Sequence, residues 1–380
     1  ALSPLDACEP LFWALQRLLL KTTAGLGPRQ NELKPRLNGP TSSQRMAYAL
    51  IDSNEVLGDT IETGKMFCLE SRRIRQMNVT PTDATLGAVV TEVNLANLTD
   101  NLWESIHASF LEYGVLIFPG QHLSEQAQGK FALRFGNAEK MHPQQPGPSV
   151  QLSNQKANGE MVDPEDQGYR LLKGNEGWHT DSTYMPLAAK AGMLAALVVP
   201  PENGETEFAD MRAAWDELDD DTQKKLEGLS AYHSLYYSQS RDGFNHTTDH
   251  SYGLHVKGAP LRPIVKTHPE TGRKSIYTGR HAYGIPGMSP QASELLLSDL
   301  LDNACQPPRT HKHTWCIGDI AVWDNRCVMH RARPYDTNQP RILRASRISG
   351  EPESELAPTF ADHRASDFRP SSNNEFSLSS

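Results

Sequence analysis

The chain has 380 residues, of which 38% are hydrophobic and 22% are charged, and its formal net charge at pH 7 is -9. This composition is typical of a globular chain with room for one large or two ordinary domains. No basic block or interleaving of aromatic residues with Lys and Arg favours a nucleic-acid partner, and no apolar run approaches the roughly 20 residues that span a bilayer. We therefore expect a small-molecule partner, with neither nucleic acid nor membrane.

The five cysteines are odd in number and include no Cys-x-x-Cys pair, which argues against a disulfide framework and a structural zinc site. The pattern predicts reduced thiols and a cytoplasmic protein. Cys316 and Cys327 lie in hydrophobic segments that are typical of strands, so we expect them to be small buried residues. An organelle-targeting peptide in the basic, apolar first thirty residues is the alternative, although Asp6 and Glu9 weaken it.

Three segments are expected along the chain. Residues 1–76 contain the linker-like text "GPRQNELKPRLNGPTSSQ" and are predicted to form an N-terminal extension, poorly ordered or partly helical. Residues 77–350 form the main domain, and residues 351–380 form a C-terminal tail. No internal repeat is visible.

Four helices are predicted from caps and apolar spacing. The first follows Thr99 or Asp100 and stops at Gly114, and it leads into the strand "VLIFPG". The others cover 124–135, 219–229 and 289–304. In the last of these, Ser289 is the N-cap and a proline occupies the first helical position.

Many short strands lie between and after these helices: "GMLAALVVP", "TEFADM", "RPIVKTH", "KSIYTG", "HKHTWCI", "IAVWDN" and "RILRASRIS". The texts "HPETGRKS" and "IGDI" are typical of turns that join neighbouring strands as hairpins. Strands and helices do not alternate as they do around a parallel sheet. The prediction is a mainly β domain, an antiparallel sandwich or barrel with helices packed outside.

The stretch "NEGWHTDSTY" places His179 and Asp181 two positions apart. Such a pair is expected about 0.8 times by chance in a chain of this composition, so it is weak evidence alone. Two residues so spaced on a strand project to the same side and can share one metal ion. Non-haem iron(II) is held by two imidazoles and one carboxylate, and His330, at the end of an apolar strand, is the best candidate for the third ligand.

Eleven residues after His330 comes Arg341. If 2-oxoglutarate chelates the metal through its keto-acid end, its second carboxylate lies some distance away, and a planar guanidinium is well shaped to bind it. Arg341 is the candidate for this role. The hydroxyl of Thr206 in "NGETEFADM" is a candidate for a further hydrogen bond to the same carboxylate.

Residues 77 to about 350 resemble the TauD/TfdA family of iron(II)- and 2-oxoglutarate-dependent dioxygenases. The resemblance lies in "GVLIFPGQHLSEQAQGKFALRFG", "WHTDSTY", "VVPPENGETEFADMRAAWDEL", "GDIAVWDNRCVMHRARPYD" and "RILRAS", all in family order. It implies a double-stranded β-helix, or jelly roll, braced by helices. It also implies an oxidoreductase that uses Fe(II), 2-oxoglutarate and O₂, releases succinate and CO₂, and hydroxylates a small anionic substrate, in some members cleaving it.

The resemblance also assigns roles to residues. It implies iron ligands at His179, Asp181 and His330, 2-oxoglutarate contacts at Thr206 and Arg341, an aromatic residue near the metal at Trp323, and substrate-pocket positions at His142, Asn175 and Tyr184.

One position departs from the family pattern. Taurine-type members carry a second arginine fifteen residues beyond the last iron ligand, where this chain has Ala345. If Arg341 points inward on a regular strand, Arg347 shares its side whereas Arg344 faces away. Arg347 is therefore the expected substitute anchor for the substrate anion.

Other interpretations of these residues remain open. A zinc hydrolase can use the same three ligands, although it has no need of Arg341 and Thr206, and a non-catalytic binding protein can share the fold. His268 and Glu270 form another His-x-acid pair that could bind a metal, but the sequence "HPETG" around them is typical of a turn, so both are expected to face water. His313 is likewise expected to face water. A homo-oligomer is possible.

Overall fold

The structure is a computed structural model that describes residues 77–141, 145, 147–243, 252–255 and 257–364. The predicted N-terminal extension at 1–76 and the predicted pocket residue His142 lie outside these ranges. Within them, no helix has the length and apolar character needed to cross a membrane.

The largest sheet crosses the middle of the domain. Its spatial order is β1 (Asn78–Pro81), β2 (Ala88–Thr91), β3 (Val115–Phe118), β13 (Ile320–Asp324), β5 (Ala189–Val198), β15 (Ile342–Ser349) and β4 (Ser149–Ser153). Neighbouring strands pair antiparallel, as expected, except that β2 and β3 are parallel.

Smaller sheets complete the β structure. One sheet has the order β12 (Thr310–His313), β6 (Thr206–Asp210) and β14 (Val328–Ala332), and another has the order β11 (Ala282–Tyr283), β7 (Ser230–His233), β8 (Ala259–Pro263) and β16 (Thr359–Phe360). Strands β9 (Val265–Thr267) and β10 (Lys274–Ile276) form the hairpin predicted from "HPETGRKS". The hairpin predicted at "IGDI" is wrong, because this turn leads from β12 to β13, which belong to different sheets.

The predicted helices are present with their caps. The helices are α2 (Asp100–Tyr113), α3 (Glu125–Phe135), α4 (Gln167–Gly174), α5 (Met211–Asp216), α6 (Asp220–Leu226), α7 (Leu235–Arg241), α8 (Pro290–Ala304) and α9 (Pro352–Glu355), with a 3₁₀ turn η1 at Leu95–Asn97. The hydroxyls of Thr99 and Ser289 accept backbone N–H groups in the first turns of α2 and α8. Gly114 ends α2 with a φ of 71°, which glycine adopts without strain.

Side chains of the large sheet alternate between two cores. One set packs under α2 and α3, and the opposite set faces the sheet of β12, β6 and β14. The first set includes Leu116, Phe118, Met193, Ala195, Ile320 and Val322, and the second includes Val115, Ile117, Leu194, Ala196, Ala321, Trp323 and Leu343. The second core leads into the candidate site.

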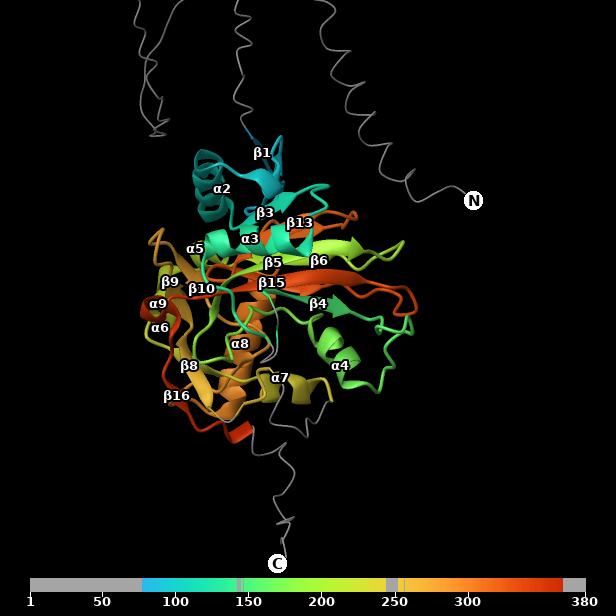
Figure 1. The fold of residues 1–380 in the computed structure, drawn as a ribbon. Helices are drawn as coiled ribbons and strands as arrows, with labels where there is room; N and C mark the ends of the chain where they lie inside the picture. The colour runs from blue at the N-terminus through green and yellow to red at the C-terminus, as the bar shows by residue number, and fades with distance from the viewer. Residues whose placement is uncertain (1–76, 142–144, 146, 244–251, 256, 365–380) are drawn as a thin grey trace, which may run out of the picture. The chain divides into compact units, whose positions relative to one another are not determined.

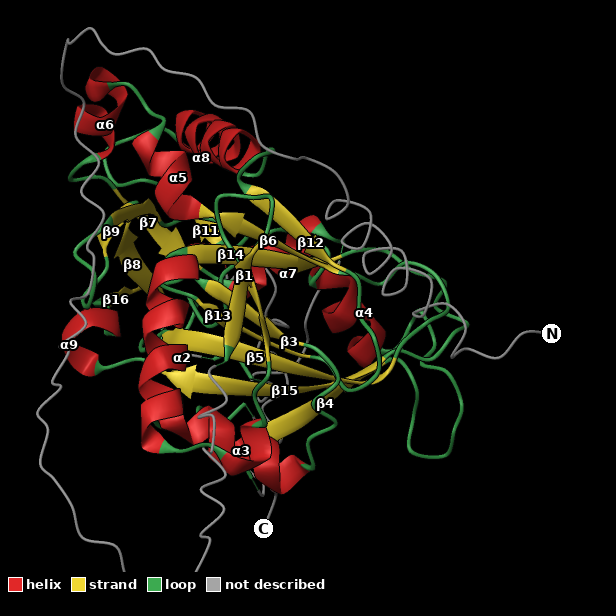
Figure 2. Cartoon of the chain, turned by 90° about the horizontal axis from the view of Figure 1, so that it is seen from above, coloured by secondary structure: helices red, strands yellow, loops and turns green. Residues whose placement is uncertain are grey.

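The helices lie on both sides of the large sheet. Figure 1 shows α2 and α3 on one side of β5 and β15, and α4, α7 and α8 on the other. Figure 2, the view from above, shows α5, α6 and α8 grouped together. Within the predicted C-terminal tail, β16 pairs with β8, so the fold continues past Gly350. The mainly β jelly roll with flanking helices is confirmed.

Candidate active site

Three buried side chains from two distant parts of the chain meet beside the second core, the one that contains Trp323. His179 and His330 face each other across an isolated antiparallel bridge, with backbone N–O distances of 3.0 and 2.9 Å. Their ring centroids are 4.3 Å apart, and Oδ2 of Asp181 lies 3.7 Å from Nε2 of His330. One ligand atom of each residue falls within 4.8 Å of the others. The geometry therefore allows one metal ion to bind all three.

The strand register explains why His330 meets the pocket. On β14, His330 pairs with Phe208 of β6, and Ala332 pairs with Thr206. Directly paired residues of antiparallel strands point to the same face, so His330 and Thr206 share one face of the small sheet. His179 is oriented by its own turn, because its Nδ1 lies 2.7 Å from the carbonyl oxygen of Gly177 and donates to it. This bond leaves the Nε2 lone pair available to a metal.

Burial sets the protonation of the three groups. Desolvation lowers the pKa of His179 to about 3 and that of His330 to about 4, so both imidazoles are neutral at pH 7. Burial alone raises the pKa of Asp181, but the Arg347 guanidinium, whose Nη2 lies 2.6 Å from Oδ1, holds it below its ordinary value. Two neutral imidazoles and one carboxylate match the donor set that iron(II) takes in non-haem oxygenases.

A cavity of about 80 Å³ opens beside this trio. Its walls come from the two sheets and from the segment before His179. The lining residues are Leu152, Asn175, His179, Asp181, Gly192, Met193, Leu194, Thr206, Trp323, His330, Ala332, Arg341, Leu343, Ala345, Ser346 and Arg347. The structure thus gathers eight of the residues singled out in the sequence around one cavity: the trio, Thr206, Arg341, Trp323, Asn175 and Arg347.

Two hydrogen-bond donors, Arg341 and Thr206, line the same cavity as the trio. Arg341 is 7% exposed, and its Nε donates to the carbonyl oxygen of Gly204 at 3.0 Å. Its guanidinium lies over the ring of Tyr335, and no carboxylate of the described residues forms an ion pair with it. Burial lowers its pKa, yet an arginine stays charged. A buried cation without an acidic partner favours binding of an anion.

Of the described substrate candidates, Asn175 and Arg347 line the cavity, whereas Tyr184 does not. Arg347 lies on the cavity side of β15, as the alternation predicted, and Ala345 also lines the cavity. Arg344 faces the other way and binds the side chain of Gln128 and the carbonyl oxygen of Leu123. Tyr184 is buried but does not line the cavity.

Two residues near the site carried no clear signal in the sequence. The ring centroid of His281 lies 4.8 Å from that of Tyr184 and 5.9 Å from that of His179, and its Nδ1 is 2.8 Å from the Ser238 hydroxyl. No sequence motif marks His281, because its contacts with Tyr184, His179 and Ser238 arise only when the chain folds. Gly192 is required by close packing, because a Cβ there would lie 2.3 Å from the Trp323 ring and 3.0 Å from Oδ2 of Asp181.

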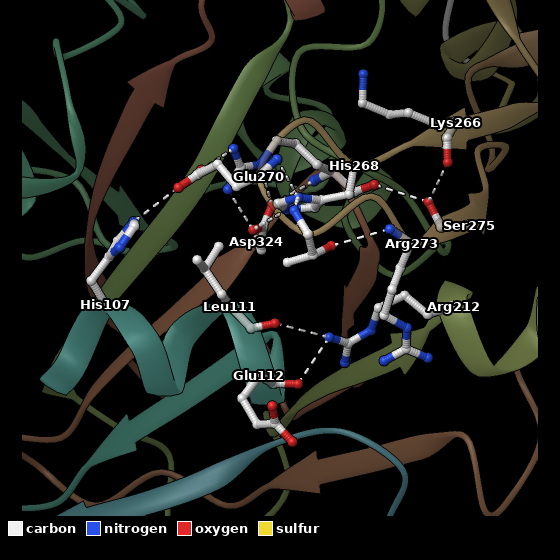
Figure 3. A network of polar contacts seen from close by, with 12 residues as sticks. His107, Leu111, Glu112, Arg212, Lys266, His268, Glu270, Arg273, Ser275 and Asp324 are labelled. Atoms are coloured by element: carbon white, nitrogen blue, oxygen red, sulfur yellow. Dashed lines mark hydrogen bonds and ion pairs between the residues drawn. The ribbon is translucent and has the colours of Figure 1, made fainter. Parts of the chain in front are cut away.

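A second buried trio, His268, Asp324 and Cys327, also brings possible ligand atoms within 4.8 Å. His268 was expected to face water; it is 2% exposed, because the β9–β10 turn folds inward onto β13. Its Nδ1 accepts the backbone N–H groups of Glu270 and Thr271, and its Nε2 donates to Asp324 at 3.0 Å. Figure 3 shows His268, Glu270 and Asp324 in this network.

The carboxylate of Asp324 in this second trio is also occupied by hydrogen bonds. Both carboxylate oxygens of Asp324 accept from Arg326, at 2.8 and 2.7 Å, and Arg326 also pairs with Glu270 at 2.6 Å. Burial raises the pKa of the Cys327 thiol, which keeps it protonated. This cluster therefore braces the turn between β13 and β14 and is not a metal site.

Two other expectations about burial are wrong. His313 is 9% exposed because its ring packs edge-on against Trp315, with centroids 4.5 Å apart. Cys316 is exposed because β12 ends at His313 and the following turn carries this cysteine outward, whereas Cys327 is buried as expected.

A jelly roll with this donor trio and an anion-binding arginine in one cavity is the arrangement of an iron(II)- and 2-oxoglutarate-dependent dioxygenase. The chain belongs to the TauD/TfdA family, since the family model "Taurine catabolism dioxygenase TauD, TfdA family" matches residues 78–346.

Individual relatives agree with this assignment. The chain is 50% identical over 288 residues to the (S)-phenoxypropionate/alpha-ketoglutarate-dioxygenase of Sphingobium herbicidovorans, covering 74% of this chain and 97% of the relative. It is 39% identical over 243 residues to the alpha-ketoglutarate-dependent 2,4-dichlorophenoxyacetate dioxygenase of Cupriavidus pinatubonensis, covering 61% and 83%.

A solved structure matches as well. The crystal structure of AAD-2 in complex with Mn(II) and N-oxalylglycine has 35% identity and a TM-score of 0.68, covering 76% of this chain and all of that one. The protein is an oxidoreductase that uses iron(II), 2-oxoglutarate and O₂.

Proposed function

We propose that this enzyme hydroxylates 2-aryloxycarboxylate anions of the phenoxypropionate class at the carbon that bears the ether oxygen. One oxygen atom of O₂ enters that C–H bond and the other enters succinate, while 2-oxoglutarate loses CO₂. The hydroxylated carbon then carries both a hydroxyl and an aryloxy group, so it collapses to a phenol and a 2-keto acid. The 50% identical relative, named for (S)-phenoxypropionate, supports this substrate class.

The observation that carries the proposal is the pair of arginines, Arg341 and Arg347, in one small cavity with a single ionised ligand, Asp181. With iron(II) bound, the charged groups that line the cavity sum to three positive charges; the buried Glu139, which accepts hydrogen bonds from Ser182 and Tyr252, lies outside this lining. Doubly charged 2-oxoglutarate leaves one positive charge, and a monoanionic substrate removes it. Because unbalanced charge in a buried site is costly, the cavity favours an anionic substrate.

The proposed roles follow from position. His179, Asp181 and His330 hold the iron, which supplies the oxidising chemistry when bound, and Thr206 and Arg341 bind the distal carboxylate of 2-oxoglutarate. Arg347 orients the substrate carboxylate. Its guanidinium has five N–H donors, and the Asp181 carboxylate and the hydroxyls of Ser182, Tyr252 and Tyr184 use at most four of them.

The rest of the substrate pocket is proposed in the same way. Asn175 and Trp323 line the cavity, and Tyr184, which does not line it, packs edge-on against His281. His142 is kept as a substrate candidate from the family resemblance alone. A cytoplasmic location, with organelle targeting as the alternative, and a possible homo-oligomer stay predictions.

Phenol release tests the proposal. The enzyme is incubated with iron(II), ascorbate, 2-oxoglutarate and each enantiomer of 2-phenoxypropionate, and phenol and succinate are measured together. We expect both products in equal amounts, preferentially from the (S) enantiomer. Succinate formation stimulated only by alkyl sulfates would replace the substrate class, and product formation without O₂ and 2-oxoglutarate would favour the hydrolase alternative.

Arg347→Met tests the anchor. We expect KM for phenoxypropionate, measured at saturating iron(II) because Arg347 also pairs with Asp181, to rise at least about 10-fold. KM for 2-oxoglutarate should change less, because its distal carboxylate is assigned to Arg341. The matched control is Arg344→Met on the same strand, which faces away from the cavity and should leave KM for phenoxypropionate unchanged. Equal effects of the two variants would contradict the anchor role.

A further inference from the structure

We propose that Trp315 is a positioning residue that fixes the Thr206 hydroxyl as a hydrogen-bond donor to the distal carboxylate of 2-oxoglutarate. The inference rests on the proposed role of Thr206. Trp315 does not line the cavity and would act only through Thr206.

The strand register brings the two residues together. Thr206 begins β6, the central strand of its sheet, and pairs with His313 on β12. Trp315 follows two residues after His313 and packs in the second core, the one that contains Trp323, where it is 6% exposed. Its indole Nε1 donates to Oγ1 of Thr206 at 3.0 Å, and Thr206 is 2% exposed. The edge-on ring of His313 supports the indole from the side.

The direction of this hydrogen bond determines what Thr206 can offer. An indole N–H only donates, whereas a hydroxyl has one donor and two acceptor lone pairs. Since Oγ1 accepts from Trp315, the hydroxyl proton must point elsewhere. Among the described residues no side-chain or backbone oxygen accepts it, so the proton is free to face the cavity that Thr206 lines.

The free donor complements Arg341. The guanidinium is also a pure donor, and the two residues line the same cavity, so together they favour a ligand group that only accepts, as a carboxylate does. Without the indole N–H, Oγ1 would regain a free lone pair. A water molecule donating to it would then compete with the carboxylate, and a bound carboxylate would meet a less ordered hydroxyl.

A double-mutant cycle tests the inference. 2-Oxoglutarate is titrated by calorimetry, without O₂, into Mn(II)-loaded wild type, Trp315→Phe, Thr206→Val and the double variant. We expect Trp315→Phe to raise Kd about 3- to 10-fold and Thr206→Val to raise it at least as much. In the double variant, the Trp315 substitution should add no further loss, because its effect passes through the hydroxyl. An undiminished effect of Trp315→Phe on the Thr206→Val background would overturn the inference.

Activity gives a second readout. With phenoxypropionate saturating, Trp315→Phe should raise KM for 2-oxoglutarate and leave kcat near the wild-type value. With 2-oxoglutarate saturating, KM for phenoxypropionate should also stay near the wild-type value. A general loss of packing would move all three together. Trp215→Phe removes a buried indole that belongs to a different core cluster from Trp315, so it is the matched control and should leave KM for 2-oxoglutarate unchanged. Thr206→Ser should keep most of the wild-type affinity, since it keeps the hydroxyl.

The design separates the inference from the function beneath it. If Arg341→Met and Thr206→Val leave 2-oxoglutarate binding intact, the proposed cosubstrate site is wrong. If both weaken binding but Trp315→Phe does not, only the role of Trp315 is wrong. Should Trp315→Phe fail to fold, the indole N–H resonance of Trp315 decides: it should shift on 2-oxoglutarate binding in wild type and lose that shift in Thr206→Val, and an identical response in both would contradict the proposal.

Discussion

Two buried trios of similar composition differ in what their lone pairs already bind. His179, Asp181 and His330 border a cavity, whereas His268 and Asp324 are enclosed by Arg326 and by backbone N–H groups. Both sets bring ligand atoms within 4.8 Å. Proximity alone therefore does not make a metal site; free lone pairs next to an open volume do.

The role of arginine shows the same contrast. Arg326 is bidentate on Asp324 and uses both carboxylate oxygens, while Arg347 is hydrogen-bonded to only one oxygen of Asp181. The other oxygen of Asp181, Oδ2, is the one that lies toward His330. An arginine thus occupies both oxygens of Asp324, whereas the arginine beside Asp181 leaves one oxygen able to bind a metal.

The strongest test of the contrast is removal of a ligand. His179→Ala should lower succinate formation at least about 100-fold, because a lost ligand affects metal binding more than the loss of a supporting residue, which costs about 10- to 100-fold. Mn(II) should raise the Tm of wild type and leave that of His179→Ala unchanged, since stabilisation by a ligand requires binding. Retained Mn(II) stabilisation in His179→Ala would place the metal elsewhere.

The opposite pattern is expected in the second trio. Asp324→Asn leaves Arg326 buried without its full partner, and we expect a loss of about 3–5 kcal/mol in the free energy of unfolding, measured with urea. The Mn(II) affinity of the folded variant should equal that of wild type. Cys327→Ala serves as the control within the trio and should cost less, because it removes a small side chain and no charge. A fall in Mn(II) affinity in either variant would make this trio part of the metal site.

Sequence patterns predicted local features better than enclosed ones. The caps at Thr99 and Ser289 and the inward side of Arg347 follow from short-range rules, and the structure has them. The burial of His268 and His313 could not be predicted, because it depends on which strands meet across the fold.

The candidate site shows the same division. Sequence motifs identified the main residues of the site. The ring contact of His281 with His179, the close packing at Gly192 and the hydrogen bond from Trp315 to Thr206 join segments that are distant in the sequence. These contacts decide orientation, which residue type and spacing do not encode.

A smaller effect is expected at a buried histidine that belongs to neither trio. Neither ring nitrogen of His233 has a hydrogen-bond partner among the residues that the structure describes, and burial, with a lesser contribution from Arg262, lowers its pKa to about 3. In the unfolded chain the histidine takes up a proton near pH 6.5, whereas in the folded chain it does so only near pH 3, so folding loses stability as the pH falls below 6.5. Between pH 6.5 and 5.5 this one group should cost about 1 kcal/mol. His233→Phe should reduce the acid-side slope of urea stability by that amount and leave a remainder from the other buried histidines; an unchanged slope would mean that His233 is protonated in the folded protein.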